Sequence, residues 1–265
     1  MIDIDPRLVQ LGTLRNEGQH AEALRLLQQY TAAAAADSVS PPAPSRFIVM
    51  LEWTFLTEVY ASARDALRTI CDGHIARLLA GDLYLPPDER TARQDDAMPW
   101  RPTRFSLIVE MNEILGDARS TYDLFARLEA EQPALARRYA WQALPAIVEA
   151  GDFAMADRYR GDPLRLLQEV NQAALTLPLF PPNRKAPRLA ADLMNLTRSV
   201  RIGIAVLHGL GRAAEADGLR AALLAGLALD GVRALAQREL DAPGTILREL
   251  TAHQMAQEDR APAAP

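Results

Sequence analysis

The chain contains a single cysteine, Cys71, and a single lysine, Lys185, among its 265 residues. One cysteine can form no disulfide within the chain, which excludes a disulfide-stapled secreted scaffold. Positive charge is carried almost entirely by arginine, and the formal net charge is −5. A general nucleic-acid-binding protein needs clustered positive charge to displace counterions from phosphates, so this charge balance argues against nucleic acid as the partner.

Long uninterrupted apolar runs are also missing. The two longest candidates, Phe47 to Tyr60 and Val200 to Leu210, are broken by Glu52, Glu58 and Arg201. Neither reaches the roughly 20 residues that cross a bilayer. The acidic N-terminal residues lack the basic region and apolar core of a secretory signal. We therefore expect a cytoplasmic protein that does not bind membranes.

No segment alternates β-branched and polar residues between turns, so we predict no β-sheet. Apolar residues instead recur at helical spacing, which predicts an all-α protein built from antiparallel helix hairpins. Glycines at positions 18, 116, 151 and 211 mark the hairpin turns, because glycine readily adopts the left-handed conformation that ends a helix. Gly231 and Gly244 predict two further breaks.

Proline-rich stretches divide the chain, since each proline removes a backbone donor and disfavours helical geometry in the preceding residue. We predict an N-terminal helix hairpin over 1–36, a proline-rich linker over 37–46, a main α-helical repeat domain over 47–255 and a disordered tail over 256–265. A long loop is expected from Leu85 to Arg104. Within it, Trp100 either pins the loop to the protein body or contacts a partner.

The segment from Phe47 to Leu79 contains no proline, so we expect one long helix or two nearly collinear ones. Its first half is apolar on nearly every side, which is typical of a central, buried helix. The apolar stripes of the central helices predict eight interior residues: Trp53, Phe55, Leu56, Ile108, Met111, Leu115, Phe125 and Trp141.

A small residue follows each hairpin glycine by five positions, and this lets two helices approach closely. The pairs are Gly18 with Ala23, Gly116 with Thr121, Gly151 with Ala156 and Gly211 with Ala216. With Phe125 and Pro133 at the aromatic and proline positions, the pattern resembles the tetratricopeptide repeat, whose period is about 34 residues. The resemblance covers about half of the chain. It implies a right-handed α-solenoid or compact helical array that binds a protein or peptide in a concave groove, and it implies no catalytic residue.

Candidate chemical sites are few. Cys71 and His74 lie three positions apart, a spacing that could supply two zinc ligands. No second pair is nearby, and the alternative is a buried thiol beside a surface imidazole. Glu110 and Glu113 could take part in acid–base chemistry, but histidines at short helical spacing are missing. We predict no metal, no cofactor and no catalytic residue.

The leading interpretation is a non-enzymatic protein that binds another protein through its helical-repeat surface. Within that class we expect an immunity protein that neutralises a secreted toxin by direct binding, or else an adaptor or secretion chaperone. The alternative is an enzyme or small-ligand-binding protein that uses a cavity beneath the apolar helix Phe47 to Tyr60.

The resemblance also implies a docking surface, because the first helix of each tetratricopeptide hairpin lines the concave side. The helices Phe105 to Leu115 and Ala134 to Glu149 should face the groove. This nominates as partner-binding residues Glu110, Glu113, Arg138 and Gln142, with Trp100, Asp95 and Asp96 on a loop able to close over them. An acidic groove would attract a basic partner, such as a basic toxin domain, and would speed association more than it deepened affinity.

Overall fold

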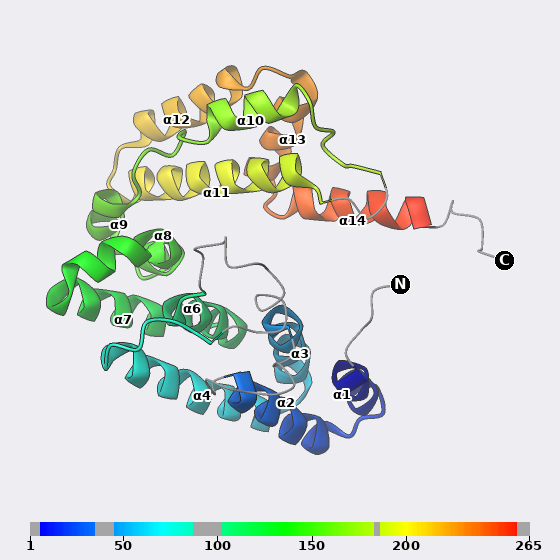
Figure 1. Cartoon of the computed structure of the whole chain (residues 1–265). Helices are drawn as coiled ribbons and strands as arrows, with labels where there is room; N and C mark the ends of the chain where they lie inside the picture. Colours follow the sequence, from blue (N-terminus) through cyan, green and yellow to red (C-terminus); the bar gives the residue numbers. More distant parts are fainter. Residues whose placement is uncertain (1–5, 35–44, 87–101, 183–185, 259–265) are drawn as a thin grey trace. The chain divides into compact units, whose positions relative to one another are not determined.

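The computed structural model describes residues 6–34, 45–86, 102–182 and 186–258, and these fold into helices (Figure 1). An isolated antiparallel bridge between Tyr84 and Thr103 is the only β-type pairing among them. The predicted all-α fold class is therefore confirmed. The tetratricopeptide-like arrangement of the helices stays a prediction.

The chain divides into two compact units, 1–146 and 147–265. Unit 1 holds α1 (Pro6–Asn16), α2 (His20–Ala34), α3 (Arg46–Val59), α4 (Ala61–Leu79), α6 (Arg104–Leu115), α7 (Ala118–Glu131) and most of α8 (Pro133–Glu149). Unit 2 holds α9 (Phe153–Tyr159), α10 (Leu167–Ala174), α11 (Arg188–Gly209), α12 (Ala213–Gly226), α13 (Asp230–Asp241) and α14 (Thr245–Glu258). The boundary between the units lies inside the stretch 47–255, and the α1–α2 hairpin packs against α3 as part of unit 1.

The four predicted hairpin glycines all have positive φ: 74° at Gly18, 65° at Gly116, 79° at Gly151 and 73° at Gly211. A residue with a Cβ would be strained there. Two of the following helices begin at an aspartate that caps them. Asp117 accepts a hydrogen bond from the Ser120 amide and Asp152 from the Met155 amide, each at 3.0 Å. The turns within these hairpins are therefore determined by residues close to them in the sequence.

Two helix boundaries differ from the prediction. The chain turns at Tyr60, whose extended backbone (φ −136°, ψ 106°) ends α3. As a result α3 and α4 pack against each other and run in different directions, so the expected long or collinear helix is wrong (Figure 1). The predicted helix break at Gly231 is also misplaced, because Gly231 lies in the first turn of α13.

The core of unit 1 contains six of the eight predicted interior residues: Trp53, Leu56, Ile108, Met111, Leu115 and Phe125. The other two predictions are wrong, since Phe55 is 38% exposed and Trp141 is 65% exposed. The Phe105 ring of α6 stacks on the Tyr139 ring of α8 with centroids 4.6 Å apart. That stack brings α6 and α8 together.

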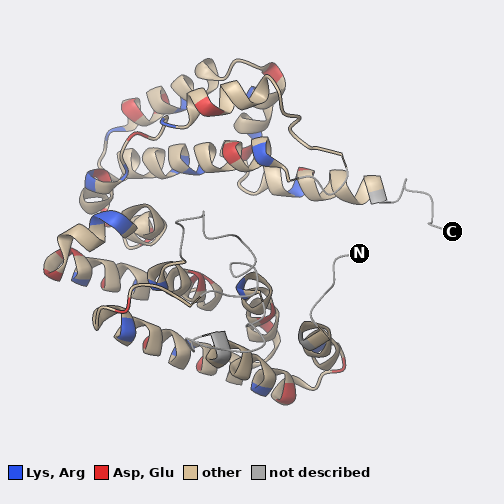
Figure 2. Cartoon of the chain, viewed as in Figure 1, with Lys and Arg blue, Asp and Glu red and all other residues tan. Residues whose placement is uncertain are grey.

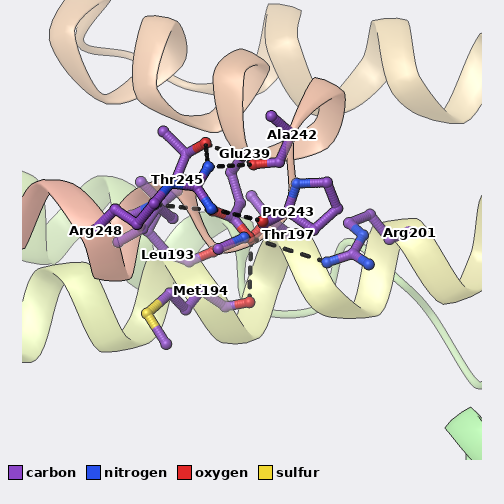
Figure 3. A network of polar contacts seen from close by, with 11 residues as sticks. Leu193, Met194, Thr197, Arg201, Glu239, Ala242, Pro243, Thr245 and Arg248 are labelled. Carbon is purple, nitrogen blue, oxygen red and sulfur yellow. Dashed lines mark hydrogen bonds and ion pairs between the residues drawn. The ribbon is translucent and has the colours of Figure 1, made fainter.

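Unit 2 is built around α11, which contacts α9, α10, α12, α13 and α14. Its core includes Leu193, Val200 and Leu235. The turn from α13 to α14 is held by the buried carboxylate of Glu239, which accepts hydrogen bonds from the amides of Gly244 and Ile246 at 2.8 and 2.9 Å (Figure 3). Glu239 thereby satisfies backbone donors at the start of α14 that would otherwise have no partner in the helix.

Candidate functional site

Glu110 and Glu113, the acidic pair nominated on α6, differ in exposure. Glu113 is exposed, whereas Glu110 is half-buried. Burial raises the pKa of Glu110, the Arg46 guanidinium opposes this rise, and the Glu113 carboxylate adds to it. Glu110 therefore lies near Arg46, the first residue of α3, and Glu113 is the more exposed of the two carboxylates.

Arg138 and Gln142, the nominated residues on α8, lie one turn apart. The exposed Arg138 places its guanidinium 5.3 Å from the centre of the Tyr84 ring. Gln142 is half-buried. Neither its Oε1 atom nor the hydroxyl of the buried Tyr139 has a hydrogen-bond partner within the part of the chain that the structure describes. Since the Phe105–Tyr139 stack joins α6 to α8, the structure places all four nominated residues on two neighbouring helices.

The other nominated residues, Trp100, Asp95 and Asp96, lie outside the described residues. The chain on either side of their segment is fixed. The Leu85 amide donates to the Pro102 carbonyl at 3.0 Å, and the Arg104 amide donates to the Leu83 carbonyl at 2.8 Å. The two ends of the segment therefore lie side by side next to Tyr84, against which Arg138 packs.

A feature that the sequence analysis missed is a row of exposed apolar side chains along α3. Phe47 is 65% exposed, Leu51 39%, Phe55 38% and Val59 59%. Residues four positions apart share a helix face, so these four form one continuous row, which we name the α3 stripe. The Arg15 guanidinium of α1 lies 4.4 Å from the Phe55 ring centre and pairs with Glu52 at 3.2 Å.

The α3 stripe could have been found from the sequence by a different argument. A helix at the surface of a small unit cannot bury every side, so an all-round apolar helix must present one face outward. The buried residues of α3 include Val49, Met50, Trp53 and Leu56. The stripe is the face left after these four pack inward.

A polar cluster lies where the C-terminal end of α4 meets the start of α6. At its centre is Arg104, whose side chain is fully buried. Its Nη1 donates to His74 Nδ1 at 2.7 Å, its Nη2 to Asp82 Oδ2 at 2.7 Å and its Nε to the Asp82 carbonyl at 2.8 Å. Arg77 shares the same carboxylate, with Nη2 2.7 Å from Asp82 Oδ2. The hydrogen bond from Arg104 is the largest of the effects that hold the pKa of Asp82 below its usual value.

His74 and Cys71 do not form a joint site. The imidazole is 6% exposed, so the expectation of a surface imidazole is wrong. Burial, and then the nearby Arg104 guanidinium, lower the pKa of His74 to about 4. The Cys71 thiol donates to Asn112 Oδ1 at 3.3 Å, and burial raises its pKa to about 12. A thiol with this pKa stays protonated and is a poor nucleophile or metal ligand at neutral pH.

The described parts of the chain contain no group of three or more His, Cys, Asp or Glu side chains that could hold a metal ion. None of the helices in these parts is long and apolar enough to span a bilayer. No protein-family model, curated protein or solved structure matches the chain significantly. The candidate site is therefore defined by its own residues: the α3 stripe and the neighbouring carboxylates of α6.

Proposed function

We propose that this protein binds another protein directly, without catalysis, through a surface of unit 1 centred on the α3 stripe. The observation that carries the proposal is the exposure of four large apolar side chains in one row. Single apolar residues at a surface are ordinary, but contiguous exposed apolar patches mark interaction sites. Rows at a spacing of four residues are how helices dock against apolar grooves or other helices.

The carboxylates of α6 give the surface its charge. The positive charge of Arg46 stabilises the Glu110 carboxylate. Arg46 directly precedes Phe47 at the start of the stripe. Arg46 offsets the charge of Glu110, which leaves Glu113 of α6 and Glu58 of α3 as exposed carboxylates. The partner that fits is a segment with an apolar face and an adjoining lysine or arginine, and the attraction of opposite charges would speed its capture.

The distribution of charge on both units is compatible with a basic partner. Figure 2 shows arginines and carboxylates interspersed on the helices of each unit. The chain as a whole carries −5, and a net charge of this sign favours encounter with a basic protein. A toxin-neutralising immunity protein for a basic secreted toxin domain is the role in this class that we propose first, ahead of an adaptor or secretion chaperone.

The test is capture of the partner from the native organism with three baits. The stripe variant is Phe47→Ser with Val59→Ser, which removes two side chains that are 65% and 59% exposed. The matched control is Leu247→Ser with Met255→Ser on α14, where the side chains are 55% and 61% exposed. We expect the parent and the control to retain one basic protein that the stripe variant loses. Equal recovery by all three baits would refute the α3 stripe as the docking surface.

A further inference from the structure

A pocket of about 310 Å³ opens between α2 and α4 in unit 1. Gln28 and Thr31 of α2 line one wall, and Ile70, Gly73, His74 and Arg77 of α4 line the other. This volume is at the lower end of the range of about 300–1,000 Å³ that small-molecule sites occupy. The pocket is thus large enough for a compact ligand.

The pocket is mostly apolar with a few fixed polar groups, which is the usual make-up of a ligand site. The Thr31 hydroxyl is held in place, because it donates to the Leu27 carbonyl at 2.9 Å and accepts from Trp53 Nε1 at 3.0 Å. Trp53 is fully buried. The wall on the α2 side is therefore anchored to the core of unit 1.

His74 lines this pocket, and one of its two ring nitrogens is bonded to Arg104. Its Nδ1 atom accepts from Arg104, so the proton of the neutral ring lies on Nε2. No partner for Nε2 is found among the described residues. The residue is 6% exposed and lines the pocket. Its Nε2–H is not one of the buried polar atoms without a partner, so this donor is held in place but open to solvent.

The charges at this end of the pocket do not cancel. Arg77 and Arg104 carry two positive charges, and the Asp82 carboxylate that they share carries one negative charge. None of the described pocket-lining residues is acidic. The cluster therefore has a net charge of one positive, and of its two arginines Arg77 lines the pocket while Arg104 is shielded from solvent.

We propose that the α2–α4 pocket binds a small amphipathic carboxylate. The carboxylate accepts the hydrogen bond from His74 Nε2–H beside Arg77, and the apolar body packs along Ile70. The cluster of Arg77, Arg104 and Asp82 has a net positive charge, and His74 adds an N–H donor. Charge-assisted hydrogen bonds are the stronger kind, so an anion is preferred to a neutral ligand. This site lies on α2 and α4, shares no residue with the α3 stripe and does not depend on the protein-binding proposal.

The test is titration of the full chain with sodium octanoate, followed by calorimetry and by amide NMR shifts of Gln28, Thr31 and Gly73. 1-Octanol and octylammonium serve as neutral and cationic analogues of the same length. We expect octanoate to bind at one saturable site at least about tenfold more tightly than 1-octanol, because charge-assisted hydrogen bonds are the stronger kind. We expect no binding of octylammonium. Equal affinities for octanoate and 1-octanol would overturn the proposal.

Two variants locate the site. Gly73 lies in α4 on the pocket wall with no neighbour within 4 Å of an added Cβ, so Gly73→Leu should fill the pocket without harming the fold and abolish octanoate binding. Gly218→Leu on α12 is the matched control, since Gly218 is also helical, exposed and unobstructed. Arg77→Gln should lower the octanoate affinity to that of 1-octanol. Unchanged octanoate binding in Gly73→Leu would place the ligand elsewhere and refute the pocket.

Discussion

Arg104 and His74, 30 positions apart in the chain, meet in the interior of unit 1 through a hydrogen bond of 2.7 Å. The arginine begins α6 and the histidine lies in the second half of α4. Both are buried, and the arginine also bonds to the carboxylate and the carbonyl of Asp82. The pair therefore fixes the start of α6 against the end of α4, next to the pocket.

Removal of the Arg104 guanidinium should destabilise unit 1 strongly. Arg104→Met leaves the Nδ1 acceptor of His74 and two backbone carbonyls without their donor. We expect the free energy of unfolding to fall by about 3 to 5 kcal/mol, because each buried acceptor left without its donor costs about 1 to 3 kcal/mol. Urea denaturation measures this change. Arg127→Met is the control, because Arg127 forms an exposed pair with Glu131 that should contribute less than about 1 kcal/mol.

The low pKa of His74 should make stability depend on pH. The unfolded chain takes up this proton below the ordinary histidine pKa of 6.5, but the folded protein does so only near pH 4. The contribution is thus complete above pH 6.5 and is lost as the pH falls toward 4. His74→Asn keeps an acceptor for Arg104 and cannot be protonated. Between pH 6.5 and 4 the parent should lose up to about 3 kcal/mol relative to this variant. Parallel unfolding free energies across that range would contradict the assigned His74 environment.

The exposure of the aromatic residues predicts which substitutions matter for folding. Trp53 and Phe125 are fully buried, so Trp53→Ala and Phe125→Ala should each cost about 3 to 5 kcal/mol. Trp141→Ala and Phe55→Ala should each cost no more than about 1 kcal/mol, the latter chiefly through the lost contact with Arg15. Thermal melts of the four variants test this order. A Trp141→Ala variant as unstable as Trp53→Ala would show that the helix faces are misassigned.

The turns of the fold could be predicted from the sequence because their causes are local. Gly116 has a positive φ and Asp117 caps the next helix, and both effects depend on residues within one turn of the chain. The faces of α3 could not be predicted in this way. Its sequence is apolar on nearly every side, so periodicity does not distinguish the buried Trp53 from the half-exposed Phe55.

The candidate sites depend on contacts between distant parts of the chain, which explains what the sequence analysis missed. Cys71 and His74 suggest a pair by their spacing, yet their partners are Asn112 and Arg104, from α6. The nominated Glu110 does interact with Arg46 of α3. An argument from size predicts that the apolar α3 leaves one face outward, but only the packed structure shows which residues form that face. Spacing along the chain can therefore nominate charged residues without showing which surface they flank.

Glu113 should control how fast a basic partner associates. Glu113→Arg is a cleaner change than reversal of both carboxylates, because Glu110 is half-buried and interacts with Arg46. We expect a lower association rate constant and a weaker dependence of that rate on salt, since exposed charges act mainly on encounter. The control is Asp217→Arg on the exposed face of α12, which changes the net charge equally. Equal association rates in both variants would separate Glu113 from the docking surface.

The measurement that tests protein binding through α3 most directly is the dissociation rate of the captured partner from the purified parent, the stripe variant and the α14 control. Apolar contacts at the centre of an interface act mainly on dissociation. The loss of Phe47 and Val59 should therefore speed release by about 100-fold or more, as expected when two anchor side chains are removed. The α14 control should release the partner at the parental rate. A stripe variant that folds like the parent and releases the partner equally slowly would contradict docking on the α3 stripe.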